Sequence, residues 1–263
     1  MMIAAWIGCD NDSSNQEWAD VTYISPMYAS VSTLADEITT EDPKAQTGLG
    51  KIITYGNYIF INQPMEGVHV VDNSDPSNPV NQSFINIPGN LDIAIVDNHL
   101  YADMFSALVV FNLTDLQSPQ FLEEFTVEDV FYYDTYWNFP EEVWEESFVR
   151  YEEYADTSKG IVVGWQTEVR RERVDNAYPD YALMDGGVPT AAPNEDNMGS
   201  NTSTAGSMTR FLPIGSYLYT INFNELVLFQ IGSDYRPSPW IKKNTDTQAE
   251  TLFQLNDLLF VGS

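Results

Sequence analysis

The chain is poor in the residues on which many catalytic and metal sites depend. Its 263 residues include one cysteine and two histidines. A single cysteine, Cys9, excludes a disulfide within the chain, and neither His69 nor His99 has a cysteine or a second histidine near it in sequence. No phosphate-binding loop, nucleophile elbow or dinucleotide fingerprint is present. We therefore expect no metal site, no cofactor and no catalytic residues of those classes.

Basic residues are scarce as well. Eleven lysines and arginines stand against 39 aspartates and glutamates, which gives a formal net charge of −28. The electrostatic field of a strongly negative protein repels the phosphate backbone of nucleic acids, so the composition argues against nucleic acid as a partner. After the first few residues, no segment approaches the roughly 18 apolar residues that a membrane-spanning helix requires.

What the sequence does contain is an internal repeat. Similar segments begin at Gly56 and, 41 residues later, at Asp97; a third begins at Gly215 and a fourth, again 41 residues on, at Asn256. The first three lead into an apolar segment and a turn marked by proline. A period near 40 residues is typical of propeller blades, each of which contains four strands.

The first two repeats each predict four short strands. They fall at 51–54, 58–62, 68–71 and 80–87, and again at 91–96, 99–104, 107–113 and 120–127. We expect an all-β fold, a partial β-propeller of four-stranded blades over residues 21–263, with about three and a half blades present. Because the fourth repeat stops at Ser263, we also expect the chain to be a fragment of a longer protein.

An irregular insertion at about 128–207 separates the second recognisable blade from the third. It predicts a short helix over 140–154, a strand pair over 159–173 and a flexible loop over 185–207. A diverged blade hidden in this stretch is the alternative, since the insertion is about two blade lengths long.

Residues 131–139 of the insertion combine aromatic rings with carboxylate and amide groups. That mixture stacks on sugar rings or anchors a protein interface, so Tyr133, Tyr136 and Trp137 are the candidate ligand-binding residues. The alternative is a hydrophobic cluster packed beneath the insertion.

The N-terminus resembles the end of a lipoprotein signal peptide. An apolar run precedes Gly8 and Cys9, and Asp, Asn and Ser follow. The small residue before cysteine is what lipoprotein signal peptidase requires. We interpret residues 1–8 as a clipped signal peptide, Cys9 as the lipidation site and 9–20 as a flexible tether. A free or buried cysteine near a frayed terminus is the alternative.

Two segments carry a family resemblance. Residues 67–79 (GVHVVDNSDPSNP) and their echo at 108–119 (LVVFNLTDLQSP) resemble the LVIVD repeat of bacterial propeller proteins. The resemblance extends from about Tyr23 to the end of the sequence. It implies a β-propeller, a lipid on Cys9 and a place at the bacterial outer membrane or cell surface. It transfers no catalytic motif, ligand or partner.

The sequence thus predicts an exported, lipid-anchored β-propeller that acts as a non-enzymatic binding or scaffold module of the cell envelope. Its expected partners are the membrane, through the anchor, and an envelope protein or a glycan. The alternative is a propeller-type glycan hydrolase or a carbohydrate-binding protein. Adjacent acids such as Glu123 and Glu124 abound, but neighbours on a strand point to opposite faces. Three or more acids that converge on the channel mouth would favour the hydrolase.

Overall fold

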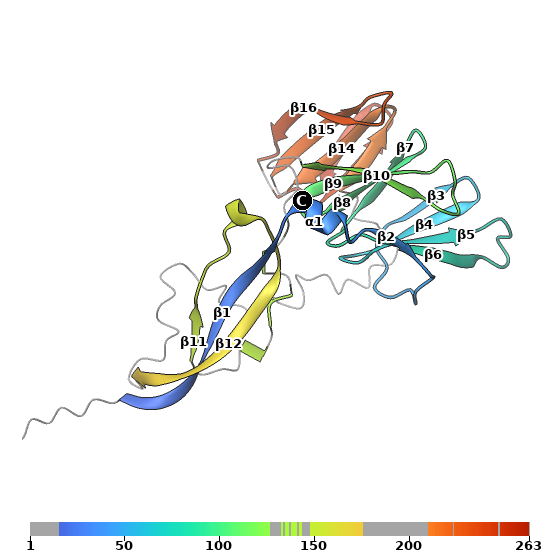
Figure 1. The fold of residues 1–263 in the computed structure, drawn as a ribbon. Coiled ribbons are helices and arrows are strands. Elements are labelled where there is room, and N and C mark those ends of the chain that lie inside the picture. The colour runs from blue at the N-terminus through green and yellow to red at the C-terminus, as the bar shows by residue number, and fades with distance from the viewer. Residues whose placement is uncertain are drawn as a thin grey trace, which may run out of the picture. The chain divides into compact units, whose positions relative to one another are not determined.

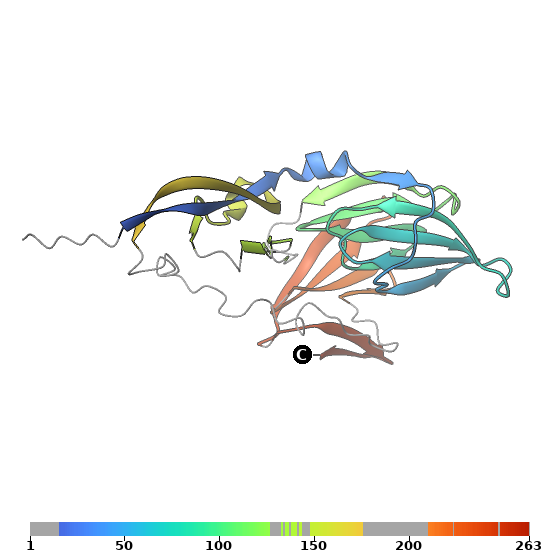
Figure 2. The same cartoon turned by 90° about the horizontal axis from the view of Figure 1, so that it is seen from below.

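The computed structural model describes residues 16–126, 133, 135–136, 138–140, 142–143, 148–175, 210–222, 224–246 and 248–262 (Figures 1 and 2). These residues form β-strands and one short α-helix, α1 (Val31–Ala35), so the all-β prediction is confirmed. The chain divides into two compact units. The smaller unit comprises Met1–Tyr28, Thr135–Thr157 and Val162–Thr202, and the larger comprises Ala29–Asp134, Ser158–Ile161 and Ser203–Ser263.

The larger unit contains four antiparallel sheets. The first has the order β2-β6-β5-β4-β3, with β2 (Thr39–Glu41), β3 (Ile52–Tyr55), β4 (Tyr58–Gln63), β5 (Gly67–Asp72) and β6 (Val80–Asn86). The second has the order β10-β9-β8-β7, with β7 (Ile93–Val96), β8 (His99–Met104), β9 (Ala107–Asn112) and β10 (Gln120–Thr126). All eight strands that the first two repeats predict are confirmed to within two residues.

The remaining two sheets follow the same pattern. The third has the order β13-β14-β15-β16, with β13 (Phe211–Ile214), β14 (Tyr217–Asn222), β15 (Glu225–Ile231) and β16 (Pro237–Asn244). The fourth pairs β17 (Thr251–Leu255) with β18 (Leu258–Gly262). The first strands of successive sheets contact one another, β3 with β7, β7 with β13 and β13 with β17.

The turn between the first and second strands explains why the repeat is recognisable. Its first residue has a positive φ in all four sheets, 58° at Gly56, 42° at Asp97, 59° at Gly215 and 53° at Asn256. Glycine, asparagine and aspartate tolerate this conformation, and it gives the tight turn whose twist matches that of the strands. The local sequence therefore favours the first hairpin of each sheet.

Apolar side chains fill the space between the second and third sheets. Tyr101, Leu108 and Val110 of the second sheet form one cluster with Phe211 and Phe229 of the third, and all five are at most 1% exposed. Full burial of such side chains contributes about 1.5–3 kcal/mol each to the free energy of folding. This burial explains the nearly continuous apolar pattern of the third strands, which are covered on both faces.

The smaller unit holds a three-stranded sheet with the order β11-β1-β12, formed by β1 (Gln16–Ala29), β11 (Val149–Tyr151) and β12 (Ile161–Asp175). Strand β1 runs parallel to β11, with Thr22 opposite Val149. Residues 21–28 thus pair with part of the insertion rather than with the first sheet. A short 3₁₀ turn, η2 (Thr157–Lys159), precedes β12.

Three expectations about these segments are wrong. Residues 16–20, assigned to the tether, lie in β1. The expected helix over 140–154 contains β11, because Val149–Tyr151 pair with β1, and this pairing outweighs the local helix signals. The expected strand pair over 159–173 is the single long strand β12. The signal peptide, Cys9, Trp137 and the loop at 185–207 lie outside the described residues.

No helix among the described residues is long and apolar enough to cross a membrane.

Candidate functional site

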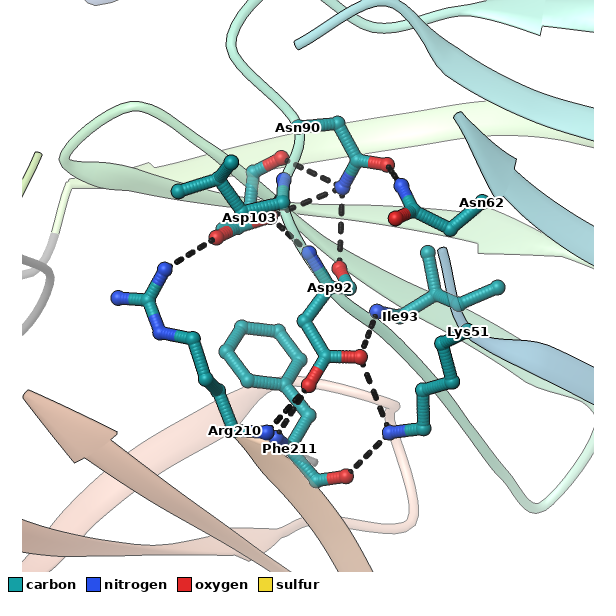
Figure 3. A network of polar contacts seen from close by, with 9 residues as sticks. Lys51, Asn62, Asn90, Asp92, Ile93, Asp103, Arg210 and Phe211 are labelled. Carbon is teal, nitrogen blue, oxygen red and sulfur yellow. Dashed lines mark hydrogen bonds and ion pairs between the residues drawn. The ribbon is translucent and has the colours of Figure 1, made fainter. Parts of the chain in front are cut away.

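Three charged residues occupy equivalent places in the larger unit (Figure 3). Lys51, Asp92 and Arg210 each stand directly before the first strand of their sheet, β3, β7 and β13. Each also precedes the first residue of the repeat's turn by five positions. Because these first strands contact one another, the three side chains approach the same junction with charges that alternate in sign.

The carboxylate of Asp92 joins the three sheets. Its Oδ1 lies 3.0 Å from Nζ of Lys51 and accepts a hydrogen bond from the backbone N–H of Ile93 at 2.7 Å. Its Oδ2 accepts from the backbone N–H groups of Arg210 and Phe211 at 2.6 and 2.7 Å. Nζ of Lys51 also donates to the carbonyl oxygen of Phe211 at 2.6 Å. With 1% exposure, Asp92 is a buried carboxylate that is fully hydrogen-bonded.

A second buried carboxylate, Asp103 on β8, lies next to it. Its Oδ1 accepts from the backbone N–H of Leu91 at 2.7 Å and of Asp92 at 2.9 Å, and from Nδ2 of Asn90 at 2.9 Å. Its Oδ2 is 3.7 Å from Nη1 of Arg210. Burial raises the pKa of Asp103 to about 6, although the Arg210 charge and the backbone donors act in the opposite direction.

Two amides extend the network into the first sheet. Asn62 on β4 has the repeat position that Asp103 has on β8, and its Nδ2 donates to Oδ1 of Asn90 at 2.5 Å. Nδ2 of Asn90 in turn donates to the carbonyl oxygens of Asp92 and Asp103 at 3.0 and 3.1 Å. Both amides are fully buried, so the polar network is continuous from β4 to the start of β13.

This arrangement suits mechanical linkage better than catalysis. A general acid must come within hydrogen-bond reach of a substrate, and Asp92 and Asp103 are each only 1% exposed. The raised pKa of Asp103 is a property of catalytic acids, but its oxygens face backbone donors and Arg210 instead of open space. Among the described residues there is no group of three or more His, Cys, Asp or Glu side chains that could hold a metal ion.

The predicted ligand-binding tyrosines belong to different units, Tyr133 to the larger and Tyr136 to the smaller. Tyr133 meets Phe105 edge to face, with ring centroids 5.5 Å apart. Tyr136 stacks on Trp165 of β12 at 5.2 Å and 16°, and it also contacts Phe139. Trp137, the third of the candidates, lies outside the described residues.

The surroundings of Tyr136 form an aromatic cluster in the smaller unit. Trp165, 7% exposed, lies at its centre; its Nε1 donates to the carbonyl oxygen of Thr135 at 3.0 Å, and the rings of Phe139 and Tyr151 pack against it edge to face. Burial raises the pKa of Tyr151 to about 12, and the neighbouring Tyr136 and Tyr154 add to the shift. This packing favours the hydrophobic-cluster interpretation for Tyr136.

The buried network went unpredicted, although the sequence carries a signal for it. Aligning the turns at Gly56, Asp97 and Gly215 places Lys51, Asp92 and Arg210 in one column of alternating charge. Residues at the same position of successive repeats come close together when the equivalent strands of those repeats are in contact, so opposite charges in one column predict ion pairs there.

Comparisons with known proteins add no assignment. No protein-family model matches the chain, and a search of curated proteins finds no relative. The resemblance to the LVIVD repeat therefore stays a prediction.

Proposed function

We propose that the sheets of the larger unit are propeller blades and that the protein is a non-enzymatic binding or scaffold module, exported and lipid-anchored in the bacterial cell envelope. The observation that carries this proposal is the buried network itself. Its two carboxylates, Asp92 and Asp103, are engaged in joining three sheets, and a rigid scaffold requires such a junction.

The propeller assignment is supported by the equivalence of the sheets. Apart from the additional strand β2 at one edge of the first sheet, the three larger ones share strand order, and their first strands contact one another. Each also has an irregularity in the pairing of the third strand of the repeat with the fourth, next to Val71, Phe121 and Phe229. Radial repetition of four-stranded sheets around an axis is what defines a propeller.

The hydrolase alternative finds little support in the placement of the acids. Glu123 on β10 pairs with Arg236 at 2.8 Å, and Glu152 pairs with Arg170 at 2.9 Å. Glu153 accepts a hydrogen bond from the hydroxyl of Tyr28 at 3.2 Å. These three acids are engaged in ion pairs and a hydrogen bond, and these contacts do not supply the two facing carboxylates that glycoside hydrolysis requires.

A binding role and a hydrolytic role predict different results when this protein is tested with the glycans and proteins of the cell envelope. We expect the purified chain to release no reducing sugar from envelope glycans. We expect a photo-crosslinking residue in place of Glu124, on the outer strand β10, to capture a defined envelope component in the native bacterium. Glycan turnover that Asp103→Asn abolishes would contradict the proposal, and so would crosslinking no stronger than at an unrelated exported protein.

The lipid anchor is tested separately. Metabolic labelling with a fatty-acid analogue is expected to mark the wild-type protein and to fail for Cys9→Ala. Ser13→Ala, a change four residues away, is the matched control and should label normally. Unchanged labelling of Cys9→Ala would refute the anchor without touching the binding role.

A further inference from the structure

The connection between β2 and β3 crosses one face of the first sheet. The order β2-β6-β5-β4-β3 places these two strands at opposite edges, about 19 Å apart at the usual strand spacing of about 4.8 Å. An extended chain covers roughly 3.3–3.6 Å per residue, so residues 42–51 are long enough to cross. We call residues 42–50 the strap; its path from β2 to β3 can be followed in Figure 2.

A row of paired residues marks the face that the strap covers. Register pairs Glu41 with Phe84, Phe84 with His69, His69 with Ile61 and Ile61 with Ile52, so all five side chains point to the same side of the sheet. Phe84 and His69 are 0% exposed and Ile61 is 8% exposed, whereas Ile52 at the edge is 59% exposed.

A few polar contacts hold the strap on this face. The backbone N–H of Thr47 donates to Oε1 of Gln63 at 3.3 Å, and the carbonyl oxygen of Lys44 accepts from Nδ2 of Asn81 at 2.9 Å. Nζ of Lys44 lies 4.3 Å from the centre of the Phe84 ring. Gly50, at the end of the strap, is paired with β4, because its N–H donates to the carbonyl oxygen of Asn62 at 2.8 Å. Residues 42–49 are themselves exposed, so this part of the strap can lift without disrupting the pairing of the sheet.

His69 lies beneath the strap in its neutral form. Its Nε2 is 2.8 Å from Oε1 of Gln63, an acceptor, so Nε2 carries the proton and Nδ1 has the lone pair. Nδ1 is buried and has no hydrogen-bond partner in the described part of the chain. The ring of Phe84 packs against the imidazole at 4.8 Å. A proton on Nδ1 would therefore create a buried charge whose new donor has no acceptor.

The charges around His69 act in both directions. Burial lowers the pKa of the imidazole; Glu66, in the turn between β4 and β5, raises it, and Lys44 of the strap lowers it further. Glu41 of β2 pairs with Lys44 at 2.9 Å and so offsets part of that positive charge. Once the strap lifts, water can solvate the imidazolium and the pKa returns toward its ordinary value of about 6.5.

We propose that the strap is a pH-dependent lid that opens when His69 takes up a proton. The closed state holds the neutral imidazole, so closure is complete above the ordinary pKa of histidine and is lost as the pH falls. Below a pH of about 6.5, each unit of acidification raises the ratio of open to closed strap up to about tenfold. Opening uncovers Phe84 and Ile61 beside the exposed Ile52, which together form an apolar surface.

Amide exchange tests the lid directly. With exchange rates of the whole chain corrected for intrinsic pH dependence, the amide of Thr47, which donates to Gln63 in the closed state, should lose protection by up to about tenfold per unit between pH 6.5 and 5. Protection in β9 should not change over the same range, which separates opening of the strap from global unfolding. Equal loss in both segments, or no loss in the strap, would overturn the proposal.

Variants assign the effect to the histidine. His69→Gln should abolish the pH dependence, whereas His99→Gln, which changes the chain's other histidine, should retain it. Glu66→Gln removes a charge that raises the pKa of His69 without touching the strap's contacts, so opening should shift to lower pH. If His69→Gln does not fold, the Glu66→Gln shift and the separate NMR titrations of the two histidines still decide. The lid would be refuted if Glu66→Gln left the pH of strap opening unchanged. It would also be refuted if His69 and His99 took up their protons over the same pH range.

Discussion

Asp92→Asn is expected to destabilise the larger unit by about 3–5 kcal/mol, the cost of removing one partner from a buried ion pair. The carboxylate is 1% exposed, and Lys51, its partner, keeps a charge that asparagine cannot balance. The side-chain NH2 group of the new asparagine would point either at the backbone N–H groups of Arg210 and Phe211 or at the backbone N–H of Ile93 and the ammonium of Lys51. In both orientations one hydrogen-bond donor faces other donors. Each buried donor left unpaired costs about 1–3 kcal/mol, within the same range.

The assay is urea unfolding followed by circular dichroism, together with exchange of the amides in β7 and β13, which report on the junction itself. Asp115→Asn is the matched control, because Asp115 is exposed and its Oδ1 accepts from the N–H of Gln117 at 3.0 Å in a turn that asparagine can also form. We expect that control to change the free energy of unfolding by no more than about 0.5 kcal/mol.

The reasoning would be refuted if Asp92→Asn lost less than about 1 kcal/mol, or no more than the control. Combining it with Lys51→Met measures the ion pair separately: coupling of about 0.5–3 kcal/mol between the two changes is expected for groups in contact. Additive effects would show that the backbone donors alone account for the loss.

Three further changes test other parts of the structure. Burial raises the pKa of Asp103 to about 6, so the protonated carboxyl stabilises the fold fully below a pH of about 4, and this stabilisation of about 3 kcal/mol is lost as the pH rises to 6. The difference in the free energy of unfolding between wild type and Asp103→Asn should therefore fall over that range of pH. A difference that does not change with pH would contradict this prediction. Trp165→Ala should lower the free energy of unfolding by about 3–5 kcal/mol and remove amide-exchange protection from β1 and β12, because the ring is buried. Tyr136→Phe should lower it by less than about 1 kcal/mol. Fully retained protection in Trp165→Ala would contradict the packing role of the ring. Gly67→Ala should lower the melting temperature well beyond Gly48→Ala, because a Cβ at Gly67 would overlap the carbonyl oxygen of Ile85 and one at Gly48 meets nothing within 4 Å; equal shifts would disprove this.

Strands could be predicted where local signals and tertiary packing agree. The first hairpin of each sheet in the larger unit has a turn residue at positive φ, and the strands are rich in apolar residues, so the repeat predicts the eight strands of the first two sheets to within two residues. Proline positions agree as well, because Pro79 and Pro119 directly precede β6 and β10, the fourth strands of the first two repeats.

The smaller unit could not be predicted in the same way. Thr22 of β1 pairs with Val149, more than 120 residues away in the chain, and nothing in a local window records such a partner. Pro140 and the acids that follow it do favour a helix, but pairing of Val149–Tyr151 with β1 decides the conformation.

The sequence alone determined the all-β class, the repeat and its hairpins, because turn chemistry and strand periodicity act between near neighbours. Only the tertiary structure decided which polar groups are buried. Lys51, Asp92 and Arg210 are ordinary charged residues in the sequence, and they become one junction because their strands meet. His69 is covered because the strap crosses the face on which it lies. Burial and charge pairing depend on distance in space, which local sequence does not encode.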